Sequence, residues 1–234
     1  MTTPHYTQEV GRKFHPDGTP RLFPGNTIIC FVDPASPIGM AAQAFQAALG
    51  QMPIGRKFAL LPPASFHMTV MELLCDQVRT PDRWSSWLPL DAPLATIDAF
   101  FLERLPAVPA PDGLAVRVTG VAHPDNLWLT LQPADDFTGA ALRAYRDAVA
   151  TATGVRFPDH DTYRFHLSLA YRLIALDADE EQQLAALVRT WQPRLQAAGD
   201  WIALPLPLLT GFDDMTRFVP LAQPDTLVTR QPPV

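Results

Sequence analysis

A short motif that occurs twice constrains this chain more than any other feature. The stretches "SFHMTVMEL" and "RFHLSLAYR" share the form Phe-His-x-Thr/Ser-aliphatic, and one lies in each half of the chain. The interval from Asn26 to His67 matches the interval from Asn126 to His166 to within one residue. Each interval reads as a strand, a helix, a loop and a strand that carries the histidine. The matched order predicts an internal duplication, and therefore a fold built from two similar halves.

The hydrophobic periodicity elsewhere predicts an α+β protein with many short elements. Its 25 prolines argue against long uninterrupted helices. Strands are predicted at 26–32, 57–62, 66–73, 114–121, 126–133 and 164–173. Helices are predicted from residue 36 to near Gly50, at 135–154 and at 177–199. The late segment 201–221 is predicted to return to the sheet.

Composition and charge describe an ordinary globular protein and exclude several classes of partner. The chain has 234 residues, of which 47% are hydrophobic and 18% charged, and its net charge is −6. A negative net charge gives no positive potential to attract a long nucleic acid, but it does not exclude a small anionic substrate. The chain shows no secretion signal or membrane span, and Cys30 and Cys75 lack the spacing of a metal or redox pair. We therefore expect reduced thiols and a cytoplasmic location.

Alternate side chains of a strand share a face, so the two motifs place polar groups together. His67 and Thr69 are expected on one face, as are His166 and Ser168, while the aliphatic and thioether residues next to them enter the core. If the halves pack about a pseudo-twofold axis, these polar faces meet across one groove. The groove would then hold two imidazoles and two hydroxyls.

The same alternation assigns the neighbouring residues to one face of the strand or the other. Ser65 and Arg164 fall on the histidine faces, and Arg164 is a candidate phosphate clamp or a solvated edge charge. Tyr163 lies at a strand entrance and is a candidate lining residue of the cleft. Tyr171 is expected on the core face, and Glu72 lies off the face of the first histidine and reads as structural.

Other basic and imidazole groups are weaker candidates. Lys13 and Lys57 are possible phosphate contacts. Four further histidines lie in loops rich in Pro, Gly or Asp and are expected to be exposed, namely His5, His15, His123 and His160. The run Asp159-His160-Asp161 is not expected to hold a metal, because three adjacent residues of an extended chain cannot all face one ion.

Two histidines around a phosphate suit acid–base cleavage of a phosphodiester. One neutral imidazole can remove a proton from the nucleophile while one imidazolium protonates the leaving oxygen, since a pKa of about 6.5 populates both forms near neutrality. Hydroxyls two residues further on can donate hydrogen bonds to the nonbridging phosphate oxygens.

Phe66-His67-Met68-Thr69-Val70 and Phe165-His166-Leu167-Ser168-Leu169 resemble the paired motifs of the two-histidine (2H) phosphoesterase superfamily. The resemblance covers about residues 24–212. It implies a bilobed fold with two pseudo-twofold-related antiparallel sheets around a central cleft and helices on the outer faces. It also implies cleavage of small 2′,3′-cyclic or related phosphodiesters without a metal or other cofactor.

On this basis residues 1–234 are expected to form one domain, with lobes at 24–105 and 114–212 and the C-terminal tail packing back. Residues 1–23 would be an N-terminal extension, and their sequence resembles the opening of a less characterised branch of the superfamily. A binding module that holds a nucleotide or phosphometabolite without turnover is the alternative. A metal-dependent hydrolase is disfavoured, because hydroxyls are poor zinc ligands and no acidic or Cys partner has suitable spacing. The oligomeric state is left open.

Overall fold

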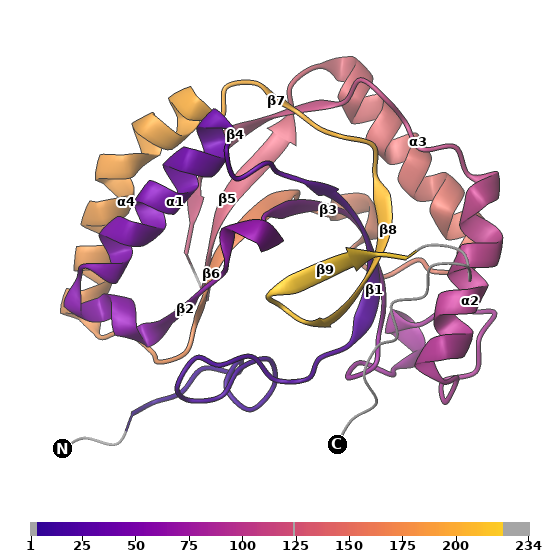
Figure 1. The fold of residues 1–234 in the computed structure, drawn as a ribbon, viewed down its shortest axis with the longest axis horizontal. Coiled ribbons are helices and arrows are strands. Elements are labelled where there is room, and N and C mark those ends of the chain that lie inside the picture. Colours follow the sequence, from indigo (N-terminus) through magenta and orange to yellow (C-terminus); the bar gives the residue numbers. More distant parts are fainter. Residues whose placement is uncertain (1–3, 124, 222–234) are drawn as a thin grey trace.

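The computed structural model describes residues 4–123 and 125–221. Its strands are β1 Gly25–Phe31, β2 Phe58–Leu60, β3 His67–Cys75, β4 Ala115–Ala122, β5 Asn126–Pro133, β6 His166–Arg172, β7 Ile202–Ala203, β8 Leu208–Asp214 and β9 Arg217–Pro220. They form one antiparallel sheet in the order β7-β4-β5-β6-β3-β1-β8-β9, and β2 also pairs with β6 (Figure 1). The α+β class is therefore confirmed.

The longer helices are α1 Pro37–Gly50, α2 Leu94–Arg104, α3 Asp136–Thr153 and α4 Ala178–Ala198. Figure 1 shows α1 beside α4 on one side of the curled sheet and α2 beside α3 on the other. None of the helices within the described residues is long and apolar enough to cross a membrane. Three helices match the predicted ones, whereas α2 was not predicted.

Local sequence signals explain where these helices start and stop. The Ser36 side chain accepts a hydrogen bond from the first turn of α1, and Asp135 does the same for α3. Asp177 and Glu180 form a capping box at the start of α4. Gly154 ends α3 in the left-handed conformation at φ 66°, which glycine adopts without a steric penalty.

The 21-residue helix α4 matches the helix predicted at 177–199, although it contains Pro193. A proline inside a helix has no N–H to donate to the carbonyl four residues earlier, here that of Arg189. Pro193 and Arg189 are both exposed, so water can hydrate this carbonyl. The helix therefore tolerates its proline on the solvent side.

The two histidine strands lie side by side at the centre of the sheet. Their ladder contains a single residue pair, Met68 with Leu167, so the strands of the two halves join into one sheet. This corrects the expectation of two separate sheets. The pseudo-twofold axis and the lobe boundaries at 24–105 and 114–212 stay predictions.

Most of the core lies between the sheet and the helices. It includes the motif residues expected to face inward, all of which are fully buried: Met68, Val70, Leu167 and Leu169. A second, smaller cluster forms where the N-terminal segment crosses the sheet, with Phe14 and Phe23 packed against Leu61, Phe212 and Met215. The segment before β1 is thus packed against the sheet, and β8 joins the sheet through β1, as the pattern of 201–221 predicted.

Candidate active site

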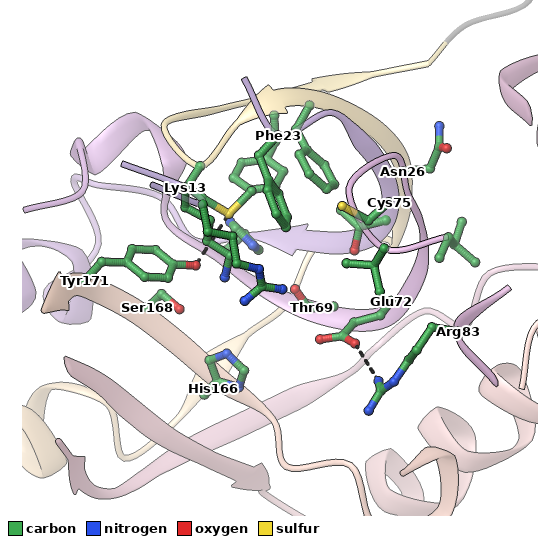
Figure 2. A pocket seen from close by; sticks show the side chains of 18 of the residues that line it. Lys13, Phe23, Asn26, Thr69, Glu72, Cys75, Arg83, His166, Ser168 and Tyr171 are labelled. Atoms are coloured by element: carbon green, nitrogen blue, oxygen red, sulfur yellow. Dashed lines mark hydrogen bonds and ion pairs between the residues drawn. The ribbon is translucent and has the colours of Figure 1, made fainter. Parts of the chain in front are cut away.

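The sheet brings the two motifs to one cavity. His67, Thr69, His166 and Ser168 all line a pocket of about 460 Å³, a size common for small-molecule sites (Figure 2). The two strands are neighbours, so residues of both motifs that point away from the core meet on the same side of the sheet. The four principal candidates from the sequence are therefore together.

Both imidazoles are oriented by the same contact. Nδ1 of His67 lies 2.6 Å from the carbonyl oxygen of Ser65, and Nδ1 of His166 lies 3.0 Å from that of Arg164. A carbonyl only accepts, so Nδ1 carries the proton and donates in each case. This leaves Nε2 of each ring available to the pocket and fixes its tautomer when the ring is neutral.

The environment of His67 favours its neutral form. Burial lowers the pKa of His67 to about 4, and the nearby positive charge of His166 acts in the same direction. The carbonyl of Ser65 opposes the shift. The ring of Phe218 packs on the imidazole with its centroid 4.2 Å away, which excludes water from that side. His67 is therefore an unprotonated base at neutral pH.

A β-bulge interrupts β3 just after its motif. Ile28 and Ile29 are consecutive in β1, yet they pair with Met71 and Thr69 of β3. Val70 is therefore an extra residue on the β3 side, and it shifts the alternation of Met71 and Glu72 by one position, up to the second register shift before Cys75.

An equivalent bulge interrupts β6. Leu127 and Trp128 of β5 pair with Ala170 and Ser168, so that Leu169 is the extra residue. It stands three residues after the histidine, as the extra residue does in β3. This shared irregularity is structural support for the predicted duplication, because bulges are specific features of a backbone.

The bulges correct two expectations about side-chain direction. Glu72 and Tyr171 both follow a bulge by two residues, and both line the pocket. Strict alternation placed Glu72 off the histidine face and Tyr171 on the core face. The extra residue in each strand turns them to the same side as His67 and His166. Figure 2 shows Glu72 and Tyr171 beside the same cavity as His166.

A buried polar side chain from a helix supports each bulge. From α3, Arg146 donates to the carbonyl of Val70 at 2.5 Å and to that of His160 at 2.7 Å. From α1, Gln46 donates to the carbonyl of Leu169 at 2.7 Å and to a second backbone carbonyl at 2.9 Å. Each helix therefore satisfies the irregular backbone of the histidine strand in the other half, since buried carbonyls need a donor.

Comparison with known proteins agrees with this geometry. A family model named 2H-phosphodiest, described as a domain of unknown function (DUF1868), matches residues 13–126. The chain therefore resembles the 2H phosphoesterase-like family over just under half of its length. The matched region contains the motif of His67, and the motif of His166 lies beyond it. The match suggests a function of phosphodiesterase type.

Two solved structures are similar to this chain. The conserved protein of unknown function ATU0111 from Agrobacterium tumefaciens str. C58 is 28% identical with a TM-score of 0.85, over 94% of this chain and 93% of that chain. TT0787 of Thermus thermophilus is 16% identical with a TM-score of 0.41, over 65% of this chain and 76% of that chain. No curated protein matches the chain.

The structure separates the two secondary candidates from the sequence, Tyr163 and Arg164. Tyr163 lines the pocket, and the guanidinium of Arg146 lies 4.6 Å from the centre of its ring. Burial and the Glu72 carboxylate hold the pKa of Tyr163 well above its usual value. Arg164 instead lines a second pocket, because it precedes the regular part of β6. Its backbone carbonyl orients His166, but its side chain does not reach the cleft.

Three cations line the pocket, and only one of them was a candidate in the sequence. Lys13 and Arg12 come from the N-terminal segment, and Arg83 follows β3 (Figure 2). Lys57, the other candidate, does not line the pocket, because it pairs with Glu180 at 2.5 Å. Arg12 and Arg83 belong to no sequence motif, so only the tertiary structure shows that they lie at the pocket.

One cluster outside the cleft has metal-ligand chemistry. Ligand atoms of Asp147, His160 and Asp161 lie within 4.8 Å of one another. The guanidinium of Arg156 already pairs with both carboxylates, at 2.9 and 2.7 Å. A cation is thus supplied by the chain itself, and the cluster reads as an ion-pair network. His160 is buried here, contrary to the expectation that the loop histidines are exposed.

Proposed function

We propose that the protein is a metal-independent phosphoesterase that opens small 2′,3′-cyclic or related phosphodiesters by acid–base catalysis. His67 acts as the general base and His166 as the general acid, and Thr69 and Ser168 bind the phosphate. The observation that carries this proposal is the pair of backbone-oriented imidazoles lining one pocket together with the two motif hydroxyls. The match to the family model supports the same type of chemistry.

In the proposed reaction, water attacks the phosphorus atom and the ring P–O bond breaks. His67 accepts a proton of the attacking water, and His166 gives a proton to the leaving ribose oxygen. After the reaction His67 is therefore protonated and His166 is neutral. Solvent restores them. Thr69 and Ser168 donate to the nonbridging oxygens, where negative charge grows in the transition state.

The assignment of roles follows from the difference between the two histidines. The low pKa of His67 keeps it neutral in the free enzyme, which is the form that a base needs. A bound phosphate anion raises the pKa of a neighbouring imidazole, because an opposite charge favours the protonated form. Substrate binding therefore strengthens His67 as a base at the moment of attack.

Size and charge support a small substrate. The pocket of about 460 Å³ suits a mononucleotide-sized ligand, while the net charge of −6 disfavours a long polyanion. The two histidines would supply the proton transfers that a metal-bound water otherwise provides. The free thiols of Cys30 and Cys75 fit the reducing cytoplasm, which is where we place the protein.

The test is product formation from cyclic mononucleotides and from a long single-stranded RNA, each with and without excess chelator. We expect the mononucleotides to be opened in chelator, and His67→Ala to abolish this activity. His5→Ala is the matched control, because this exposed histidine lies outside the pocket. Tight binding without turnover would replace the proposal by a binding module. Loss of activity in chelator would indicate a metal-dependent hydrolase instead. A preference for long RNA would contradict the proposal that the substrate is small.

A further inference from the structure

The charged residues of the pocket are mostly basic, although the whole chain is acidic. Among the residues that the structure describes, its lining contains three permanent cations, Arg12, Lys13 and Arg83, and one carboxylate, that of Glu72. The chain carries a net charge of −6, so it repels anions in general. A local excess of cations in such a chain marks the place where an anion can bind.

Two of the cations are paired to different degrees. Arg83 lies between two carboxylates, 3.0 Å from that of Asp159 and 3.6 Å from that of Glu72. Its charge is therefore balanced within the protein. Lys13 has one partner, the buried carboxylate of Glu9 at 3.6 Å, and the same carboxylate also accepts from the side chain of Asn126.

Arg12 stands apart from the other two. Within residues 4–123 and 125–221 it has no carboxylate partner, and its guanidinium lies 5.1 Å from the centre of the Phe23 ring. The ring holds the cation at the pocket while leaving its N–H groups free to donate. Arg12 is thus the pocket cation with the most unused binding capacity.

The basic pair lies beside the motif residues rather than among them. The ammonium of Lys13 is 4.7 Å from the centre of the Tyr171 ring and 5.5 Å from that of Phe23. Figure 2 shows Lys13 between these two aromatic residues, with Ser168 between Tyr171 and His166. The histidines and hydroxyls accommodate one phosphate, and the pair is available for another negative group further along the cavity.

We propose that Arg12 and Lys13 form a second anion subsite, so that the preferred substrate is a cyclic phosphodiester that also carries a terminal phosphate. A nucleoside 2′,3′-cyclic phosphate with a 5′-phosphate has this chemistry. The rings of Phe23 and Tyr171, which flank Lys13, supply apolar surface for the nucleoside. The inference rests on the proposed function and names the substrate class of the same site.

The kinetic test compares two substrates, a nucleoside 2′,3′-cyclic phosphate and the same compound with a 5′-phosphate. The wild type should prefer the 5′-phosphorylated compound by about tenfold or more in kcat/KM, the usual effect of a charge-assisted hydrogen bond. Arg12→Gln should bring this ratio close to one, and Lys13→Gln should lower it. Arg56→Gln, an exposed arginine outside the pocket, should keep the wild-type ratio. An unchanged ratio in Arg12→Gln overturns the subsite.

A binding measurement separates this inference from the proposed catalysis. Calorimetry with a nucleoside 2′,5′-bisphosphate and a nucleoside 2′-monophosphate requires no turnover. The bisphosphate should bind the wild type at least about tenfold more tightly, and Arg12→Gln should remove the difference. If this holds while no cyclic compound is opened, the subsite stands and the catalytic proposal fails. Equal affinity of the wild type for both ligands overturns the subsite even if cyclic compounds are opened.

Discussion

The two histidines occupy the same position in their strands, yet their surroundings differ. Phe218 covers the ring of His67 at 4.2 Å, whereas the nearest aromatic centroids to His166 are those of Trp128 at 5.4 Å and Tyr163 at 6.3 Å. Burial makes the protonated form of His67 costly, so its pKa falls to about 4. The two imidazoles therefore share a motif but differ in their surroundings, and this difference supports His67 as the base of the proposed reaction.

The low pKa of His67 also makes stability depend on pH. The unfolded chain binds a proton at this residue below about pH 6.5, whereas the folded protein does so only below about pH 4. The unfolded state therefore holds more protons between these values, and stability falls as the pH drops through this window. Between pH 7 and pH 5 the contribution of His67 should fall by about 2 kcal/mol.

Urea denaturation of the wild type and of His67→Gln at both pH values measures this effect. The glutamine variant should lose about 2 kcal/mol less stability than the wild type on acidification, since glutamine does not titrate. His5→Gln serves as the control, because His5 is exposed. Equal losses in wild type and His67→Gln would show that burial does not lower the pKa of His67.

At the scale of elements, the site depends on irregular strands that the helices stabilise. Gln46 follows Asn26 at the same interval as Arg146 follows Asn126, so the two donors occupy equivalent positions of the two halves. Each donates to the carbonyl of a bulge residue on the opposite histidine strand. Because the bulge decides which way Glu72 points, the helices contribute to the shape of the pocket without lining it.

Removing one of these donors should therefore affect both stability and turnover. Arg146→Met leaves the buried carbonyls of Val70 and His160 without their donor, which should cost about 3 kcal/mol of unfolding free energy. Arg143→Met is the matched control on the same helix, because Arg143 is exposed. Chemical denaturation measures the loss, and kcat measured where the variant is folded should also fall. An unaltered kcat would mean that the bulge keeps its shape without Arg146.

The sequence predicted the elements well where the pattern was regular, and failed where one residue broke it. Both histidines and both hydroxyls precede the bulges, so simple alternation placed them correctly on one face. Glu72 and Tyr171 come after the bulges, and an extra residue in a strand leaves no local signal that alternation can detect. The position of Arg12 depends on how the N-terminal segment crosses the sheet, which is a long-range contact that periodicity does not report.

For the whole molecule, the important feature is that the N-terminal segment is an integral part of the fold. Phe14 is 1% exposed, and its ring centroid lies 5.0 Å from that of Tyr171. Its cluster joins residues before β1, between β2 and β3, and around β8 into one small core. The same segment carries Arg12 and Lys13 to the pocket, so the fold links the packing of residues 4–24 to the binding site.

Phe14→Ala should accordingly destabilise the protein by about 3 to 5 kcal/mol, the usual cost of removing a buried phenylalanine side chain. Phe137→Ala is the control, because Phe137 is 61% exposed and its removal should change stability by less than about 0.5 kcal/mol. Denaturant unfolding of both variants measures the two costs. A small effect of Phe14→Ala would indicate that the N-terminal segment contributes little to folding.

The central claim is that His67 and His166 serve one reaction, and double-mutant kinetics test it most directly. The measurement is kcat for a nucleoside 2′,3′-cyclic phosphate in His67→Ala, His166→Ala and the double variant, each checked for native folding. Groups that act as a unit give strongly non-additive losses, so the double variant should be no more than slightly slower than either single variant. A double variant slowed by the product of the two single effects would contradict the shared mechanism.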